Sequence, residues 1–201
     1  MGDDDDAPTD TDDTTTDADF SPADADWTAT LALTEADWDA VVDLRMRVFV
    51  DEQGVPEELE LDEYDEDPLD SDVDHLLVRD SDGSGGDADS ETDETRTVEV
   101  VATARIRAVD AAEYGALDEA AERIAKVERV VVARDRRGEG WGARVMAAVE
   151  DRARTRGLNE VVLHAQTRAA GFYERLGYAV DDAVGTFDED GIEHVRMRRR
   201  I

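Results

Sequence analysis

Residues 127–143 have the composition of a binding site for a phosphorylated ligand. Residues 127–133 are mostly β-branched and apolar, which is typical of a buried strand. Residues 134–142 form a basic loop with three glycines, and a helical pattern of apolar residues begins at Ala143. The first amides of a helix lack intrahelical partners and lie at the positive end of its dipole, and glycine lets an anion approach them. The loop residues expected to bind the anion are Arg134, Arg136, Arg137, Gly138, Gly140 and Gly142.

The spacing of these glycines distinguishes between several known types of phosphate-binding loop. A Walker loop ends in Gly-Lys-Ser/Thr, which is absent, and the dinucleotide pattern G-x-G-x-x-G differs from the G-x-G-x-G found here. Arg137-x-x-Gly140-x-Gly142 instead resembles the R/Q-x-x-G-x-G/A pattern of the GCN5-related N-acetyltransferases. The resemblance implies that the loop holds the pyrophosphate of acetyl-coenzyme A and that the preceding strand aligns its pantetheine arm. The alternative is a glycine-rich turn beside a surface helix.

A second motif lies in a predicted helix whose apolar residues recur at helical spacing from Trp38 to Val48 and which ends before Pro56. It resembles the ElaA-type subgroup of the same family and consists of Arg45, Phe49, Val50, Glu52 and Gln53. The apolar members of the motif fit core packing. Glu52 and Gln53 are too polar for that role, and they could line the acceptor site or cap the helix.

A third motif, F-Y-x-x-x-G-Y at residues 172–178, resembles the family signature F-Y-x-x-x-G-F/Y. The resemblance implies that Tyr173 donates a proton to the departing thiolate, and that a strand amide polarises the thioester carbonyl. The alternative for Tyr173 is a packed aromatic whose hydroxyl bonds to the backbone. Gln166 stands where the family usually has asparagine, and we expect it to bond the pantetheine arm. The implied coenzyme-binding residues are Val130, Val131, Val132, Arg136, Arg137, Gly138, Gly140, Trp141, Gly142, Ala143 and Gln166.

The sequence leaves the general base for the acceptor amine open among three residues. Glu128 lies on the predicted central strand, two residues before the expected thioester contact. His164 ends the neighbouring predicted strand, and an imidazole suits proton transfer at neutral pH. A water relay to Glu52 is the third option.

The charge of the chain limits its partners. It has 201 residues with 54 Asp/Glu and 22 Lys/Arg, a formal net charge of −32, and its one lysine is Lys126. Such a surface repels nucleic acids and anionic membranes, and it resembles adaptation to molar salt inside the cell. Residues 123–156 nevertheless contain ten Lys/Arg and five Asp/Glu. This locally positive segment favours an anionic ligand such as coenzyme A.

Several classes of chemistry are disfavoured by composition. The chain has no cysteine, so disulfides, thiolate metal sites and a cysteine acyl-enzyme are excluded. Its three histidines are far apart in sequence, so we expect no metal. No apolar run approaches the about 20 residues that span a membrane, and the acidic N-terminus lacks a signal core, so we expect a cytoplasmic protein.

The order of predicted elements gives the fold class. Residues 1–26 read as a disordered acidic tail, and residues 80–96 as a disordered acidic insertion in a domain spanning 27–201. Residues 111–125 have helical composition, and 188–191 form an acidic turn between the last two strands. The order resembles the acetyltransferase fold: an α/β protein whose mixed, mostly antiparallel sheet of seven strands, flanked by helices, splays between strands four and five.

The resemblance implies direct acetyl transfer from acetyl-CoA to a primary amine in a ternary complex. The acceptor, a small molecule or a peptide, stays open, as does the choice between monomer and homodimer. The acidic loop 57–72 could line the acceptor pocket and favour a cationic amine, or be solvated surface. Two alternatives remain: a non-catalytic acyl-CoA-binding sensor or partner module, and a synthase of the acyl-homoserine-lactone type, which shares the fold.

Overall fold

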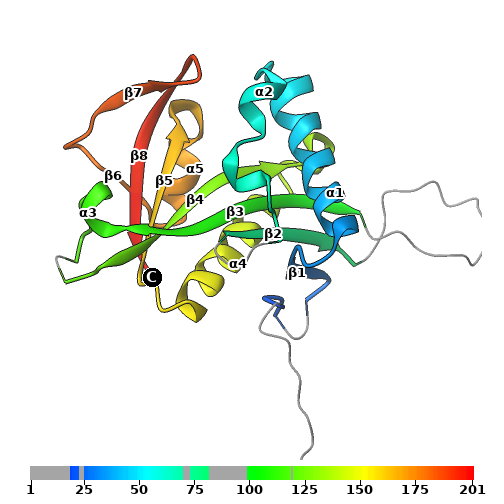
Figure 1. The fold of residues 1–201 in the computed structure, drawn as a ribbon, viewed down its shortest axis with the longest axis horizontal. Coiled ribbons are helices and arrows are strands. Elements are labelled where there is room, and N and C mark those ends of the chain that lie inside the picture. Colours follow the sequence, from blue (N-terminus) through cyan, green and yellow to red (C-terminus); the bar gives the residue numbers. More distant parts are fainter. Residues whose placement is uncertain (1–18, 23–24, 70–72, 82–98, 119) are drawn as a thin grey trace, which may run out of the picture.

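The computed structural model describes residues 19–22, 25–69, 73–81, 99–118 and 120–201 (Figure 1). The strands are β1 (Trp27–Leu31), β2 (Val73–Asp80), β3 (Val100–Asp110), β4 (Arg123–Val132), β5 (Glu160–Gln166), β6 (Ala179–Val180), β7 (Thr186–Glu189) and β8 (Ile192–Arg200). The α-helices are α1 (Glu35–Arg45), α2 (Glu57–Glu60), α3 (Ala111–Tyr114), α4 (Trp141–Thr155) and α5 (Ala170–Arg175). A π-helix, Met46–Glu52, continues α1, and short 3-10 turns occupy Glu63–Asp65, Arg134–Arg136 and Thr167–Ala169. No helix in the described ranges is long and apolar enough to cross a bilayer.

Eight strands of the described chain form one mixed sheet in the order β1-β2-β3-β4-β5-β8-β6, with β7 also paired to β8. All pairs are antiparallel except β4 with β5. The predicted α/β class and mixed, mostly antiparallel sheet are confirmed, but the predicted seven strands are one too few. The extra strand is β7, whose acidic residues read as part of a turn. Asp190 and Gly191 both have positive φ, 55° and 78°, and form the tight two-residue turn that joins β7 to β8.

Two boundaries differ from the prediction. The predicted helical segment 111–125 is helical only to Tyr114, because Gly115 takes a left-handed φ of 63° and ends α3. β4 then begins at Arg123. The predicted tail also contains ordered residues: Phe20 N donates to Ala29 O at 2.8 Å, and the ring of Phe20 packs on the core. Residues 1–18 and 23–24 of the predicted tail and residues 82–96 of the predicted insertion lie outside the described residues.

Helices cover both faces of the sheet, because neighbouring strand residues point to opposite sides. Leu76 on β2 packs into the core beneath α4, whereas Leu77 packs into the core beneath α1. Figure 1 shows α1 and α4 on either side of the β2–β3 part of the sheet. The large aliphatic residues that these helices bury include Val145, Met146 and Val149 on α4, and Val41 and Leu44 on α1.

The sheet opens between its two parallel strands. β4 and β5 pair only at residues 125–127 with 161–163, and the strands separate after that point. Residues 128–132 of β4 and 164–166 of β5 line a cavity instead. The predicted splay between the fourth and fifth strands is therefore present, and it positions the candidate site.

A buried ion network joins the helical layer to the sheet. Arg45, 1% exposed, bonds Glu60 at 2.5 Å and Asp65 at 2.8 Å. Arg105, also 1% exposed, bonds Asp62 at 2.6 Å. Three carboxylates of the acidic loop are therefore neutralised by arginines and do not form the free acidic lining considered from the sequence. We call the group the buried ion network; its members are Arg45, Glu60, Asp62, Asp65, Arg105 and Glu128.

His75 on β2 lies against this network. Its side chain is buried, its Nε2 lies 4.0 Å from Asp65, and its ring meets Trp38 edge-on at 4.7 Å. Burial, followed by the charge of Arg45, lowers the pKa of His75 to about 4. The imidazole is therefore neutral in the folded protein at physiological pH.

Replacing His75 by Phe should flatten the acid sensitivity of the fold. The unfolded chain takes up a proton near the usual pKa of 6.5, and the folded chain does so only near 4. Folding is therefore penalised as pH falls below 6.5, by about 2 kcal/mol at pH 5. Urea unfolding at pH 7.5 and pH 5 in molar KCl should show a smaller loss of unfolding free energy in the variant. Equal losses in both proteins would contradict the buried neutral imidazole.

Candidate functional site

A cavity of about 810 Å³ fills the opening between β4 and β5. Its walls come from the π-helix, the loop before α4, the separated strands, α5 and the β7–β8 hairpin. Sixteen of the residues singled out from the sequence line it, so the structure brings them together, whereas Arg134, also expected to bind the anion, is not among the lining residues. The sixteen are Glu52, Gln53, Glu128, Val130, Val131, Val132, Arg136, Arg137, Gly138, Gly140, Trp141, Gly142, Ala143, His164, Gln166 and Tyr173.

The glycine loop is shaped by backbone conformations that favour glycine. Gly138 and Gly140 have φ values of 87° and 91°, in the left-handed region where a side chain is strained. Gly140 is the N-cap of α4, and nothing lies within 4 Å of a Cβ built at Gly138. The first turn of a 15-residue helix thus opens onto the cavity, as an anion site at a helix N-terminus requires.

Gly142 connects the loop to the aromatic motif of α5. A Cβ at this position would lie 3.0 Å from Cζ of Phe172. The absence of a side chain therefore lets the Phe172 ring pack directly on the first turn of α4. Phe172 in turn meets Tyr173 edge-on at 4.9 Å, so the loop and the tyrosine are held as one unit.

Two of the three predicted loop arginines, Arg136 and Arg137, have carboxylate partners. Arg136 bonds Asp80 at 2.5 Å and Glu139 at 3.0 Å. Arg137 forms a bidentate pair with Glu52 at 2.5 and 2.8 Å, and this hydrogen bond and charge lower the pKa of Glu52. The Arg137–Glu52 pair joins the loop to the end of the π-helix across the cavity.

A bulge in β4 shapes the edge that faces β5. The register with β3 shifts between Thr103 and Arg105, and Arg129 has a φ of 52°, which is unusual for a residue other than glycine. Ala133 N donates to Val101 O, so the residues of β4 bonded to β3 alternate with residues whose backbone faces away. By this alternation the backbone N–H of Val131 faces β3 and that of Val132 faces the cavity, whereas Val130 lies within the bulge.

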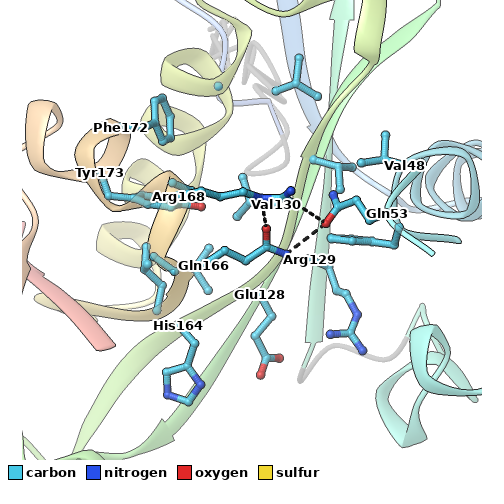
Figure 2. A pocket seen from close by; sticks show the side chains of 18 of the residues that line it. Val48, Gln53, Glu128, Arg129, Val130, His164, Gln166, Arg168, Phe172 and Tyr173 are labelled. Atoms are coloured by element: carbon cyan, nitrogen blue, oxygen red, sulfur yellow. Dashed lines mark hydrogen bonds between the residues drawn. The ribbon is translucent and has the colours of Figure 1, made fainter. Parts of the chain in front are cut away.

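Three side chains form a hydrogen-bonded cluster across the opening (Figure 2). The Gln53 side-chain oxygen accepts from Gln166 Nε2 at 3.1 Å and from Arg168 Nη2 at 3.0 Å. Arg168 Nε also donates to the Gln166 oxygen at 2.8 Å. Gln53 occupies both positions considered for it: it is the C-cap residue of the π-helix, and its side chain lies in the cavity wall. Arg168 was not selected from the sequence, since it belongs to no motif.

Tyr173 is buried where α5 meets the cavity. Burial raises the pKa of its hydroxyl to about 12, so the phenol stays protonated at neutral pH. Within the described chain no hydrogen bond engages this hydroxyl, and Phe172 and Tyr178 fix its ring by edge-on contacts at 4.9 and 5.9 Å. The group can therefore donate a proton to a charge that develops in the cavity.

Glu128 is surrounded by cations. Its carboxylate bonds Arg105 at 3.0 Å, Arg107 at 3.0 Å and Lys126 at 2.8 Å. Burial alone would raise its pKa, but the bond from Arg107 and the charges of Arg105 and Lys126 hold the pKa far below its usual range. A carboxylate that binds a proton so weakly is a poor general base.

His164 lies at the same end of the cavity as Glu128 (Figure 2). The last parallel pair is Val127 with Leu163. Continuing that register would set Glu128 opposite His164, but the strands have separated there. His164 Nδ1 lies 3.2 Å from Glu189 Oε2. Glu189 was missed because its strand, β7, read as a turn. The described residues contain no cluster of three or more side chains suited to a metal ion.

Comparisons with known proteins agree with this geometry. The acetyltransferase (GNAT) domain family matches residues 94–201. The Bacillus subtilis protein YyaT is 33% identical over 168 residues, covering 84% of this chain and 92% of YyaT. The crystal structure of an acyl-CoA N-acyltransferase from Pseudomonas aeruginosa is 28% identical with a TM-score of 0.62, covering 87% of this chain and 98% of that one. The crystal structure of Escherichia coli ElaA is 26% identical with a TM-score of 0.61, and it covers 87% of this chain and 98% of ElaA.

Replacing Gly142 by Ala should destabilise the protein although alanine favours helices. The new methyl group collides with Phe172, so the unfolding free energy should fall by about 1–3 kcal/mol. Gly171→Ala is the matched control, because the Cβ there would meet only the end of the Arg175 side chain at 3.8 Å. It should be neutral or stabilise by up to about 1 kcal/mol. Phe172→Leu should partly rescue Gly142→Ala; equal stability of the two glycine variants would contradict the contact.

Proposed function

Because this chain belongs to the GNAT acetyltransferase family and is an acyltransferase, we propose that it transfers an acetyl group from acetyl-CoA to a primary amine. The observation that carries the proposal is the shared cavity: the helix-opening loop, the free edge of β4 and the protonated Tyr173 all line it. The chain has no cysteine to hold the acetyl group. Transfer is therefore direct, with both substrates bound together.

The coenzyme fits the half of the cavity formed by the loop and α5. The amides of the first turn of α4 and the charge of Arg137 would bind the pyrophosphate. Glycine at positions 138, 140 and 142 leaves the backbone accessible. Gln166 would bond the pantetheine arm, which needs the opening between β4 and β5 to reach the reaction centre.

The cavity also supplies the groups that the chemistry needs. The N–H of Val130 or Val132 would bond the thioester oxygen and stabilise the negative charge that forms there. Tyr173 would donate its proton to the departing sulfur. His164 would take the proton from the amine, as its imidazole lies at the open end of the strand.

The two other candidates for the base are carboxylates held in ion pairs, which makes them poor proton acceptors. Glu128 is held ionised by three cations, and its role would be to neutralise Arg105, Arg107 and Lys126 at the wall of the cavity. Glu52 is paired bidentately with Arg137. It would occupy Arg137 until the coenzyme binds, and it would not relay a proton.

We also propose that the chain belongs to the ElaA-like subgroup and that its acceptor is a small molecule or a peptide amine. The subgroup rests on the 26% identity with ElaA and on the motif from Arg45 to Gln53. In the structure this motif joins the buried ion network, through Arg45, to the cavity, through Gln53.

Changing Tyr173 to Phe should lower kcat about 100-fold while acetyl-CoA binding is kept. The thiol released from acetyl-CoA can be measured without background from the protein, which has no cysteine. The assay uses spermidine, lysine and a peptide with a free N-terminus as acceptors, in molar KCl to screen the charge of −32.

Tyr178→Phe is the control, because its hydroxyl bonds Glu150 at 3.1 Å and Tyr178 does not line the cavity. This variant should keep its rate. Acetyl-CoA binding without thiol release from the wild-type protein on any amine would instead favour a non-catalytic sensor.

Changing Arg137 to Glu should abolish calorimetric binding of acetyl-CoA. The loop loses the cation expected to bind the pyrophosphate and gains a charge that repels it. Glu52→Gln should bind acetyl-CoA as tightly as wild type or more tightly, because the carboxylate that competes for Arg137 is removed. Arg47→Glu changes the net charge equally and should bind normally, because the ion-pair partner of Arg47 among the described residues is Asp43, away from the cavity. Equal binding by all three variants would exclude the loop as the coenzyme site.

A further inference from the structure

A histidine–carboxylate pair occupies the acceptor end of the cavity. His164 Nδ1 lies 3.2 Å from Glu189 Oε2 and 3.4 Å from Oε1. The two residues come from β5 and β7, which are not paired with each other. Both pair with β8, and His194 on β8 is opposite Gln166 on one side and Phe187 on the other. The β7–β8 hairpin thus brings Glu189 to the imidazole.

The ring of His164 is held in place by aromatic neighbours. Phe187 meets it edge-on at 4.8 Å with an interplanar angle of 74°. The ring of Tyr114 on α3 lies 6.4 Å away. A ring fixed on two sides and bonded at Nδ1 presents its other nitrogen in a defined direction.

The charges around His164 are mostly neutralised by other partners. Lys126 and Glu128 on β4 pair with each other at 2.8 Å. Arg196, opposite His164 on β8, pairs with Asp181 at 2.8 Å. His194 Nδ1 is hydrogen-bonded to Ile192 O at 2.8 Å. Tyr114 faces His164 with its aromatic ring and brings no charge. Glu189 is therefore the carboxylate left to interact directly with His164.

The protonation state of the pair follows from its chemistry. The hydrogen bond with His164 lowers the pKa of Glu189, so its carboxylate is ionised at neutral pH. An ionised carboxylate can only accept, so His164 Nδ1 must carry the proton. The lone pair of the neutral imidazole is then on Nε2, and no hydrogen bond within the described chain engages it.

We propose that Glu189 is a positioning residue that fixes His164 in the Nδ1–H tautomer and leaves Nε2 as the proton acceptor for the amine. This role rests on the proposed acetyl transfer. The amine nitrogen forms a bond to the thioester carbon and passes a proton to Nε2, while the carbon–sulfur bond breaks and the sulfur takes the proton of Tyr173. Glu189 stabilises the resulting imidazolium, and solvent returns that proton to the tyrosine.

The tautomer is tested directly by nitrogen-15 NMR of histidine-labelled protein in molar KCl with saturating acetyl-CoA. The signals of His164 are assigned by their loss in His164→Gln. We expect a protonated Nδ1 and an unprotonated Nε2 in the wild type, and a mixture of tautomers or the reverse one in Glu189→Gln. A wild-type Nε2–H tautomer, or an unchanged tautomer in Glu189→Gln, would overturn the role.

Kinetics provide the second readout. Glu189→Gln should lower kcat tenfold or more with an unchanged Kd for acetyl-CoA, and His164→Gln about 100-fold. Glu193→Gln removes the same charge from the opposite face of the hairpin, where Glu193 pairs with Asp188, and should keep its rate. Loss of rate in His164→Gln but not in Glu189→Gln would overturn the positioning role and leave the acetyl transfer intact. If no amine is acetylated by the wild type, the proposed function fails, and the NMR result alone decides the geometry of the pair.

Discussion

The architecture of the acceptor wall depends on one buried ion network. Arg45 and Arg105 are almost fully buried; Arg45 is matched by two carboxylates and Arg105 by three. Removing one partner of a buried ion pair typically costs about 3–5 kcal/mol, because an uncompensated charge stays behind. The network is therefore stable only when α1, the acidic loop, β3 and β4 are all in place. It holds elements that are far apart in sequence at fixed positions around the cavity.

The same network accounts for the unusual backbone of β4. Arg129 sits at the bulge with a positive φ, a conformation that costs free energy for a side chain with a Cβ. Its guanidinium bonds the carbonyl oxygens of Leu59 and Glu60 and the carboxylate of Asp62. These hydrogen bonds from the acidic loop offset the free-energy cost of the strained backbone at Arg129. The bulge directs the next residues of β4 toward the opening, where their amides can serve the reaction.

The sequence predicted the parts of the site that depend on local patterns. The loop glycines, Tyr173 and Gln166 belong to short motifs, and all of them line the cavity. It could not predict properties that depend on distant partners. Glu128 looked like a base because its three neutralising cations, two of them on β3, are invisible in a one-dimensional pattern. Glu189 escaped notice because acidic residues are rare in strands, and only its pairing with β8 reveals β7.

The charge of the molecule is arranged differently inside the cavity and outside it. A chain with net charge −32 repels an anionic coenzyme, so the site needs cations that are not fully consumed by neighbouring carboxylates. At the acceptor end Arg105, Arg107 and Lys126 are occupied by Glu128 and the loop. At the loop end the partners of Arg168 within the described chain are the neutral amides of Gln53 and Gln166, and Arg137 pairs with an exposed Glu52 that solvent can screen. The division places strongly bound ion pairs where the fold must be rigid and exchangeable ones where a charged ligand must enter.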